Sequence, residues 1–261
     1  MIVQIYEIQE PYEAQKCIEL GVDTIGSVLL STDAWHISTL RDVFRSTKGT
    51  STKNSLIPLF PNVDILYKAL DYYHPDIVHF CETLTDIHGH KIDIDPFLQL
   101  QTEVKQKFPE ISIMRSIPIP QNSTLPHFPT LEIARSFEPV SDLFLTDTWL
   151  GKEPVEGYIG ITGKTVDLGT AKDLVRQSNI PVMLAGGLSP ENVYDAVQKT
   201  MPAGADSCTQ TNWIDGKGKP IRFKKDFNKV KKFVEEVRRA ENLNGPLHHG
   251  GRPCQARPKG D

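Results

Sequence analysis

Short apolar runs recur at roughly even intervals along the chain, with segments of helical spacing between them. Each run is five to eight residues long, a length and composition that predict a buried strand. The eight runs are "IVQIY" at 2–6, "DTIGSVLL" at 23–30, "LIPLF" at 56–60, "DIVHF" at 76–80, "ISIMRSI" at 111–117, "DLFLTD" at 142–147, "PVMLA" at 181–185 and "GADSCT" at 204–209. The last run is the least apolar.

The segments between these runs have helix signals. "PYEAQKCIELG" ends at Gly21, a candidate C-cap, and places Cys17 on its apolar side, where we expect a core residue. "KDFNKVKKFVEEVRRA", near the end of the chain, gathers its apolar side chains on one face, which predicts a closing helix, and these are Phe227, Val230, Phe233, Val234 and Val237.

Eight strands alternating with helices favour a single (β/α)8 TIM barrel over a doubly wound sheet. A doubly wound sheet also carries a glycine fingerprint after its first strand, and no G-x-G-x-x-G follows residues 2–6. We assign the barrel to residues 1–244. Residues 245–261, rich in glycine, proline and arginine, have no periodicity and are predicted to be a disordered or appended tail.

Composition agrees with a globular protein of this class. The chain has 261 residues, 39% of them hydrophobic and 24% charged, and its net charge of -4 gives no basic surplus that would indicate nucleic acid as a partner. No stretch has the length and apolarity of a membrane span, and no signal peptide is evident, so we expect a cytoplasmic protein. The four cysteines are widely spaced, which indicates neither a zinc site nor a disulfide framework.

The stretch "PVMLAGGLSPENVYDAV", residues 181–197, predicts a strand, a glycine turn and a helix start with Ser189 as N-cap and Pro190 at the first helical position. Bare amides at Gly186 and Gly187 suit a phosphate or carboxylate oxygen. In barrels, phosphate is often held by the loops after the seventh and eighth strands. We therefore predict an anion site there, completed by Cys208, Thr209 and Gln210.

Polar residues at the other strand ends are the candidates for chemistry, although strand alternation keeps some of them away from the ligand. Glu7 and Asp147 are a possible base and acid pair, whereas the alternative is that each caps a helix or meets an arginine. The remaining candidates are His79, Glu82 and Arg115.

Two segments look like ligand sites by composition only. "TDIHGHKIDID", at 85–95, is rich in aspartate and histidine but matches no fixed metal spacing, so we interpret it as a solvated loop without a metal. "GITGKTVDLGT", at 160–170, lacks the spacing of a P-loop and is interpreted as a flexible lid after the sixth strand.

Taken together, the chain resembles the phosphoribosylanthranilate isomerase family over most of residues 1–238. The resemblance is carried by "ELGVDTIGSVL", "DLFLTDT", "GITGKTVDLGTAKDL", "LAGGLSPENV" and "KKDFNKVKKFVEEV". It implies a barrel of the ribulose-phosphate-binding type, cytoplasmic, that isomerises a phosphorylated aminoaldose without metal or organic cofactor. It also implies that Asp147 is the general acid, that Gly186 and Gly187 belong to the phosphate clamp, and that Lys164 lies in the loop after the sixth strand, where we count it with the substrate-binding candidates.

The departures from the family pattern fall on the chemistry. The family's Lys-Ile-Cys-Gly, whose cysteine is the general base, aligns with Gln4, Ile5, Tyr6 and Glu7. Its arginine for the anthranilate carboxylate falls on Trp35, its Val-Gln-Leu-His-Gly strand becomes "VHFCE", and its Ser-Ser-Gly becomes "CTQ". The segment "ADSCTQTNWIDGKGKPIRF" has a weaker similarity to a barrel family linked to photosystem I biogenesis.

Two classes of function remain open at this level. The first is an aldose-ketose type isomerase of an altered phosphorylated substrate, with Asp147 as acid and Glu7, aided by Tyr6, as base. The second is a non-catalytic barrel that binds a phosphate ester or serves in assembly. Both imply a small phosphorylated metabolite as ligand, no nucleic acid or membrane, and a monomer or homodimer.

Overall fold

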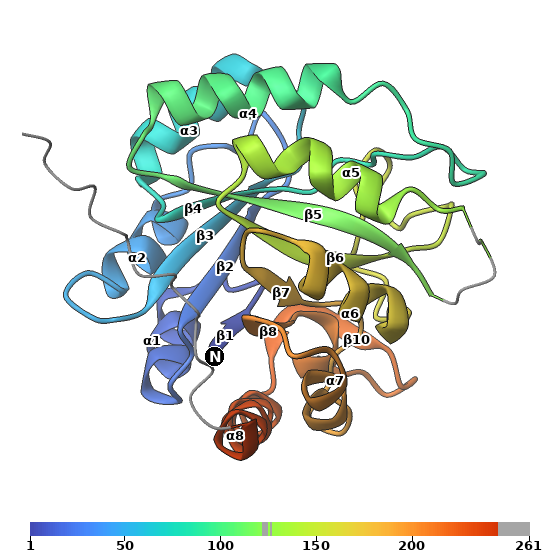
Figure 1. Ribbon diagram of the computed structural model, residues 1–261. Helices are drawn as coiled ribbons and strands as arrows, with labels where there is room; N and C mark the ends of the chain where they lie inside the picture. The colour runs from blue at the N-terminus through green and yellow to red at the C-terminus, as the bar shows by residue number, and fades with distance from the viewer. Residues whose placement is uncertain (122–124, 126, 245–261) are drawn as a thin grey trace, which may run out of the picture.

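The computed structural model describes residues 1–121, 125 and 127–244, and in it eight parallel strands close into a barrel in the order β1 to β8. Figure 1 shows the helices arranged outside these strands. The predicted (β/α)8 barrel is therefore confirmed. The predicted tail, 245–261, lies outside the described residues.

The observed strands follow the predicted apolar runs closely. They are β1 Ile2–Ile5, β2 Thr24–Leu29, β3 Lys53–Pro58, β4 Ile77–Phe80, β5 Ser112–Pro120, β6 Leu143–Trp149, β7 Val182–Leu184 and β8 Gly204–Ser207. The α-helices are α1 Pro11–Glu19, α2 Ser38–Ser46, α3 Val63–Tyr73, α4 Asp95–Lys107, α5 Thr130–Phe137, α6 Leu168–Gln177, α7 Val193–Thr200 and α8 Phe227–Asn244, with short 3-10 turns η1 Glu138–Val140 and η2 Thr209–Thr211.

Strand alternation separates two hydrophobic clusters. Side chains pointing outward pack against the helices, and these include Val3, Ile5, Val78, Phe80 and Phe144. Side chains pointing inward form a smaller cluster inside the barrel, made of Tyr6, Ile77, Met114, Leu145, Met183 and Ala185. Cys17 lies on the outer cluster at 0% exposure, as predicted.

Local sequence explains the helix ends. Gly21 follows α1 with φ +80° and its N–H donates to the carbonyl of Ile18, so the predicted terminating role is confirmed. The Asp167 side chain accepts from the N–H of Thr170 at 2.7 Å and caps α6.

The start of α7 differs from the prediction. Ser189 and Pro190 were expected at the cap and the first helical position, but the helix begins at Val193. The reason is local: the Asn192 side chain accepts from the N–H of Ser189 at 2.8 Å and donates to the carbonyl of Gly187 at 3.1 Å. These bonds hold residues 187–192 as a turn before the helix.

An antiparallel hairpin between β8 and α8 is absent from the sequence-based prediction. It pairs β9 Asn212–Ile214 with β10 Pro220–Lys225, around a turn in which Asp215 accepts from the N–H groups of Lys217 and Lys219. The hairpin side chains reach back to the end of β1, as described below.

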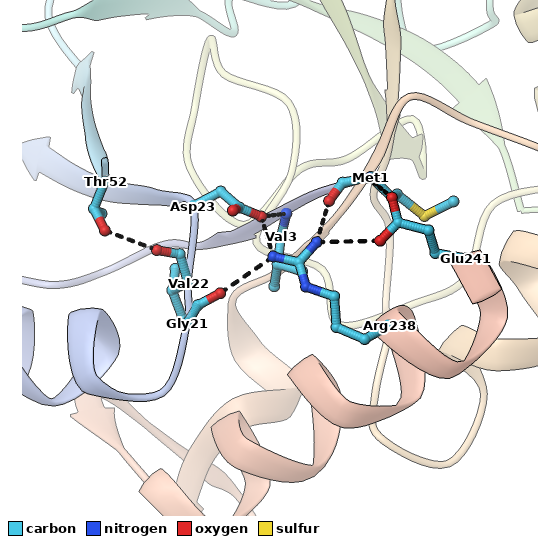
Figure 2. A network of polar contacts seen from close by, with 8 residues as sticks. All are labelled: Met1, Val3, Gly21, Val22, Asp23, Thr52, Arg238 and Glu241. Carbon is cyan, nitrogen blue, oxygen red and sulfur yellow. Dashed lines mark hydrogen bonds and ion pairs between the residues drawn. The ribbon is translucent and has the colours of Figure 1, made fainter. Parts of the chain in front are cut away.

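At the opposite end of the barrel, α8 is fastened to β1 by a polar network (Figure 2). Arg238 donates to the carbonyls of Met1 and Gly21 and forms an ion pair of 2.7 Å with Asp23, whose carboxylate also accepts from the N–H of Val3. Glu241 pairs with the amino group of Met1. The network joins both ends of the barrel domain, which closes the ring of helices.

Candidate functional site

A cavity opens at the carboxyl ends of the strands, where ligands bind in barrels. It encloses about 70 Å³, room for a few water molecules, and reaches about 720 Å³ where it opens to solvent. It brings together nine of the predicted site residues: Tyr6, Glu7, His79, Asp147, Gly186, Gly187, Cys208, Thr209 and Gln210.

Three other predicted residues, Arg115, Glu82 and Lys164, do not line the cavity. Arg115 faces outward from β5, where it forms an ion pair of 2.5 Å with Glu82 and stacks over the rings of Phe97 and Phe137. Alternation along β5 explains this, because the neighbouring Ser116 takes the inward position and bonds His79. Lys164 has an exposed side chain, and it contributes its backbone carbonyl to the loop over the cavity, where Thr148 donates to it at 2.6 Å.

The phosphate-clamp candidates come from the loops after β7 and β8. Gly186 and Gly187 have φ of +93° and +58°, and a Cβ at Gly187 would lie 2.6 Å from the backbone of Lys164. Gln210 donates to the carbonyl of Gly163 at 3.0 Å. The loop after β6 thus lies directly across both glycines and the start of η2, and only residues without side chains fit beneath it.

Two carboxylates line the centre of the cavity, of which Asp206 is buried and Asp147 is partly exposed. Burial raises the pKa of Asp147 to about 7, and the nearby charge of Asp206 raises it further. Burial also raises the pKa of Asp206 to about 7, partly offset by a hydrogen bond of 3.1 Å from Gln4 and by the charge of Lys225. A carboxyl group with a pKa near 7 can donate a proton at neutral pH and take it back.

Replacing Asp206 with asparagine is expected to stabilise the protein at pH 8. An aspartate with a raised folded-state pKa is penalised as pH rises, so its native state loses stability between about pH 4 and pH 7. A rise from 3.8 to about 7 corresponds to a difference on the order of 4 kcal/mol in unfolding free energy at pH 8.

Thermal melting of wild type and Asp206→Asn at pH 8 and pH 4 measures this. The melting-temperature gain at pH 8 should shrink as pH falls to 4. Asp195→Asn, at an exposed aspartate on α7, is the control and should show no such gain. An equal gain at both values would contradict the assignment.

Glu7 follows the end of β1, and its φ of +63° turns it into the cavity wall. Its carboxylate is already engaged by the hairpin: Arg222 pairs with it at 2.6 Å, and Asn212 and the N–H of Phe223 donate to it at 3.2 and 3.3 Å. Burial favours its neutral form, but the charges of Lys225 and Arg222 outweigh burial and lower its pKa. Such a carboxylate is a weak base.

Tyr6 occupies the centre of the barrel, and its ring lies so close to Gly26 that a Cβ there would clash. Its hydroxyl is 2.6 Å from Ser55 Oγ and 2.7 Å from His79 Nδ1, and His79 Nε2 is 2.9 Å from Ser116 Oγ. Burial raises the pKa of Tyr6, and burial together with the charge of Arg115 lowers the pKa of His79 to about 3. Both side chains are therefore neutral at pH 7.

Sequence reasoning missed Asp206, Ser55, Ser116 and the hairpin residue Arg222. Asp206 had a usable signal, because alternation along 204–209 places it on the same face as Cys208. Arg222 had none, since 215 residues separate it from Glu7.

Neither a metal centre nor a membrane span is found in the described part of the chain. No group of three or more potential metal ligands gathers there, and in the 85–95 loop His90 simply contacts Asp86 at 3.3 Å. Within the described ranges, none of the helices has the length and apolarity to cross a membrane.

Comparison with known proteins places these features in context. The family model described as N-(5'phosphoribosyl)anthranilate (PRA) isomerase matches residues 90–236. The N-(5'-phosphoribosyl)anthranilate isomerase of Methanocella arvoryzae is 30% identical over 237 residues, 90% of this chain and 97% of that protein.

Solved structures of similar fold include phosphoribosyl anthranilate isomerase from Thermotoga maritima, with a TM-score of 0.66 and 19% identity over 91% of this chain and 99% of that one. The N-(5'-phosphoribosyl)anthranilate isomerase from Pyrococcus furiosus has a TM-score of 0.62 and 20% identity, over 92% of this chain and 99% of that one.

Proposed function

The chain belongs to the N-(5'-phosphoribosyl)anthranilate isomerase family, and we propose that it isomerises a phosphorylated aminoaldose whose end opposite the phosphate carries no carboxylate. One observation carries this proposal. The cavity combines a glycine turn at one side and two carboxyl groups in its centre, and among its described lining residues none is an arginine or lysine.

The phosphate is proposed to bind at Gly186, Gly187 and Thr209. Without a cationic side chain in the described lining, backbone amides are the groups left to hold it, and glycines let a phosphate approach the backbone closely. Cys208 borders the same loop, where burial raises the pKa of its thiol, so it stays neutral beside the anion.

Asp147 is proposed as the general acid. Its protonated carboxyl group donates to the ring oxygen of the sugar, which opens the ring and leaves an imine at the first carbon. Asp206, beside it, keeps the proton affinity of Asp147 high enough for part of the population to be protonated at pH 7.

The far end of the substrate is proposed to be apolar. Trp35, aligned with the family's carboxylate-binding arginine, packs against His36 and Tyr72 on the outer side of the barrel domain. The cavity wall is instead formed by Val28, Leu59 and Ile159. A carboxylate bound there would lose its hydration without gaining a cation.

Ribose 5-phosphate is expected to raise the melting temperature of wild type, because a ligand at 100 times its Kd stabilises a protein by about 2.7 kcal/mol. Thr209→Asp should abolish that shift, since it places a negative charge beside the phosphate. Thr209→Asn introduces a side chain of nearly the same size as aspartate but without its charge, and it should keep most of the melting-temperature shift.

Equal shifts in the two variants would refute the phosphate site. Position 209 is preferable to Gly187 for this test, because any side chain at Gly187 would collide with the Lys164 backbone. A shift in wild type without turnover of any phosphorylated aminoaldose would favour the non-catalytic binding alternative.

A further inference from the structure

Two departures from the family pattern are in direct contact. Tyr6 stands where the family has its cysteine base, and His79 stands where its fourth strand has glutamine. In the barrel centre the Tyr6 hydroxyl lies 2.7 Å from His79 Nδ1, although 73 residues separate them in sequence. The replacement of the base is therefore accompanied by a second replacement that places a proton acceptor beside the new hydroxyl.

The contact extends across the barrel to Asp147. His79 Nε2 is 2.9 Å from Ser116 Oγ, and the Ser116 hydroxyl is placed to stabilise the ionised form of the Asp147 carboxyl group. At the other end, Ser55 Oγ lies 2.6 Å from the Tyr6 hydroxyl. A chain of hydrogen bonds thus leads from the position of the missing base to Ser116, next to the general acid.

We propose that Tyr6, His79 and Ser116 form a proton relay that removes the proton from the second carbon of the substrate and returns it to Asp147. The proposal rests on the isomerase function proposed above. It assigns Tyr6 as the group that touches the substrate and His79 and Ser116 as carriers behind it.

The proton transfers balance. After ring opening, Asp147 is a carboxylate and the substrate is a protonated imine. Tyr6 oxygen takes the proton of the second carbon, the C–H electron pair forms the carbon–carbon double bond, and the imine π pair moves to nitrogen. At the same time the Tyr6 proton passes to His79 Nδ1, the Nε2 proton passes to Ser116, and the Ser116 proton passes to Asp147.

The product of this step is a neutral enol, which tautomerises to the aminoketose, and Asp147 is again protonated. Afterwards His79 carries its proton on Nδ1 instead of Nε2, and exchange with water in the cavity must return it to Nε2, the tautomer that ionised Asp147 favours, before the relay acts in the next turnover. Both tautomers fit the site, because the hydroxyls of Ser55, Tyr6 and Ser116 can each donate or accept. Burial of every relay side chain suits a path on which none of the three is left charged.

Kinetics of the whole chain with N-(5-phosphoribosyl)aniline, a phosphorylated aminoaldose without a carboxylate, test the relay. Tyr6→Phe and His79→Gln each remove one proton carrier but keep shape, and kcat should fall at least about 100-fold with KM changed less than about threefold. Ser116→Ala should lower kcat at least about tenfold. Ser27→Ala, at a buried hydroxyl bonded only to the Ile8 carbonyl, is the control and should keep kcat within about threefold.

A second measurement reads the relay without turnover. In the relay, protonated Asp147 donates to Ser116, and Ser116 then donates to His79 Nε2, so that His79 holds its proton on Nδ1. When Asp147 is ionised, the direction of both hydrogen bonds reverses, and His79 holds its proton on Nε2. The imidazole ¹⁵N chemical shifts of His79 should therefore report a change of tautomer as pH passes about 7. No such change should occur in Asp147→Asn or Ser116→Ala. Arg115 stays charged throughout, and Asp206→Asn should keep the switch but move it to lower pH.

The outcomes separate the two proposals. If the wild-type protein is inactive but His79 still changes tautomer with pH, the proposed isomerase function is wrong, whereas the hydrogen-bonded connection between His79 and Asp147 is supported. Full activity in Tyr6→Phe, or a His79 tautomer that ignores both pH and the loss of the Ser116 hydroxyl, overturns the relay.

Discussion

Asp147→Asn is expected to lower kcat for a phosphorylated aminoaldose by about 100- to 10,000-fold, the contribution typical of a general acid. The amide keeps the size of the side chain and its contact with the Gly160 backbone, but it cannot donate a proton to the sugar ring oxygen. Substrate binding should persist, because the proposed phosphate site lies at a different part of the cavity. The measurement is kcat and KM of the purified variant beside wild type.

The pH dependence of kcat tests the role of Asp147 independently. If Asp147 is the general acid as proposed, its protonated form is the active one, and its pKa of about 7 predicts that kcat falls as pH rises above 7. Removing the neighbouring charge with Asp206→Asn should move that fall to lower pH, since the like charge is what helps to raise the pKa. A profile that is flat from pH 6 to pH 9 in wild type would rule out this acid.

Much of the fold followed from periodicity. All eight apolar runs overlap observed barrel strands, because a barrel strand is buried on both sides and its sequence is apolar almost throughout. The start of α7 was placed three residues early, at Pro190 instead of Val193, since the cap pattern was satisfied by Ser189 while Asn192 held the turn. The hairpin at 212–225 went unrecognised because its β10 strand is largely exposed and lacks an apolar run.

The site residues whose location follows from their place in the barrel could be predicted from the sequence. Asp147 lies near the end of β6, and Gly186, Gly187 and Thr209 follow β7 and β8, so topology brings them together at the face where the carboxyl ends of the strands meet. Partnerships between distant side chains were not predictable. Alternation favoured the outward position for Glu7, whereas a positive φ turned it inward and Arg222 then neutralised it.

Expression of this chain in a tryptophan-requiring cell that lacks phosphoribosylanthranilate isomerase is expected not to restore growth. The substrate of that reaction carries a carboxylate, and burying a carboxylate without its cation costs about 3 kcal/mol or more, roughly 100-fold in kcat/KM. In the purified protein, N-(5-phosphoribosyl)aniline should accordingly be turned over with at least about 100-fold higher kcat/KM than N-(5-phosphoribosyl)anthranilate. The two compounds differ only in the carboxylate, so their ratio isolates the contact that Trp35 cannot supply.

Two controls make the negative growth result informative. A family member with the intact cysteine and arginine, expressed from the same vector, must restore growth, and this chain must be detected as folded protein in the same cells. Growth that this chain restores and Asp147→Asn abolishes would overturn the proposed substrate while keeping the acid. In that case the carboxylate must find a cation outside the present lining, and Arg222 is a candidate, because its exposed guanidinium pairs with Glu7 in the cavity wall.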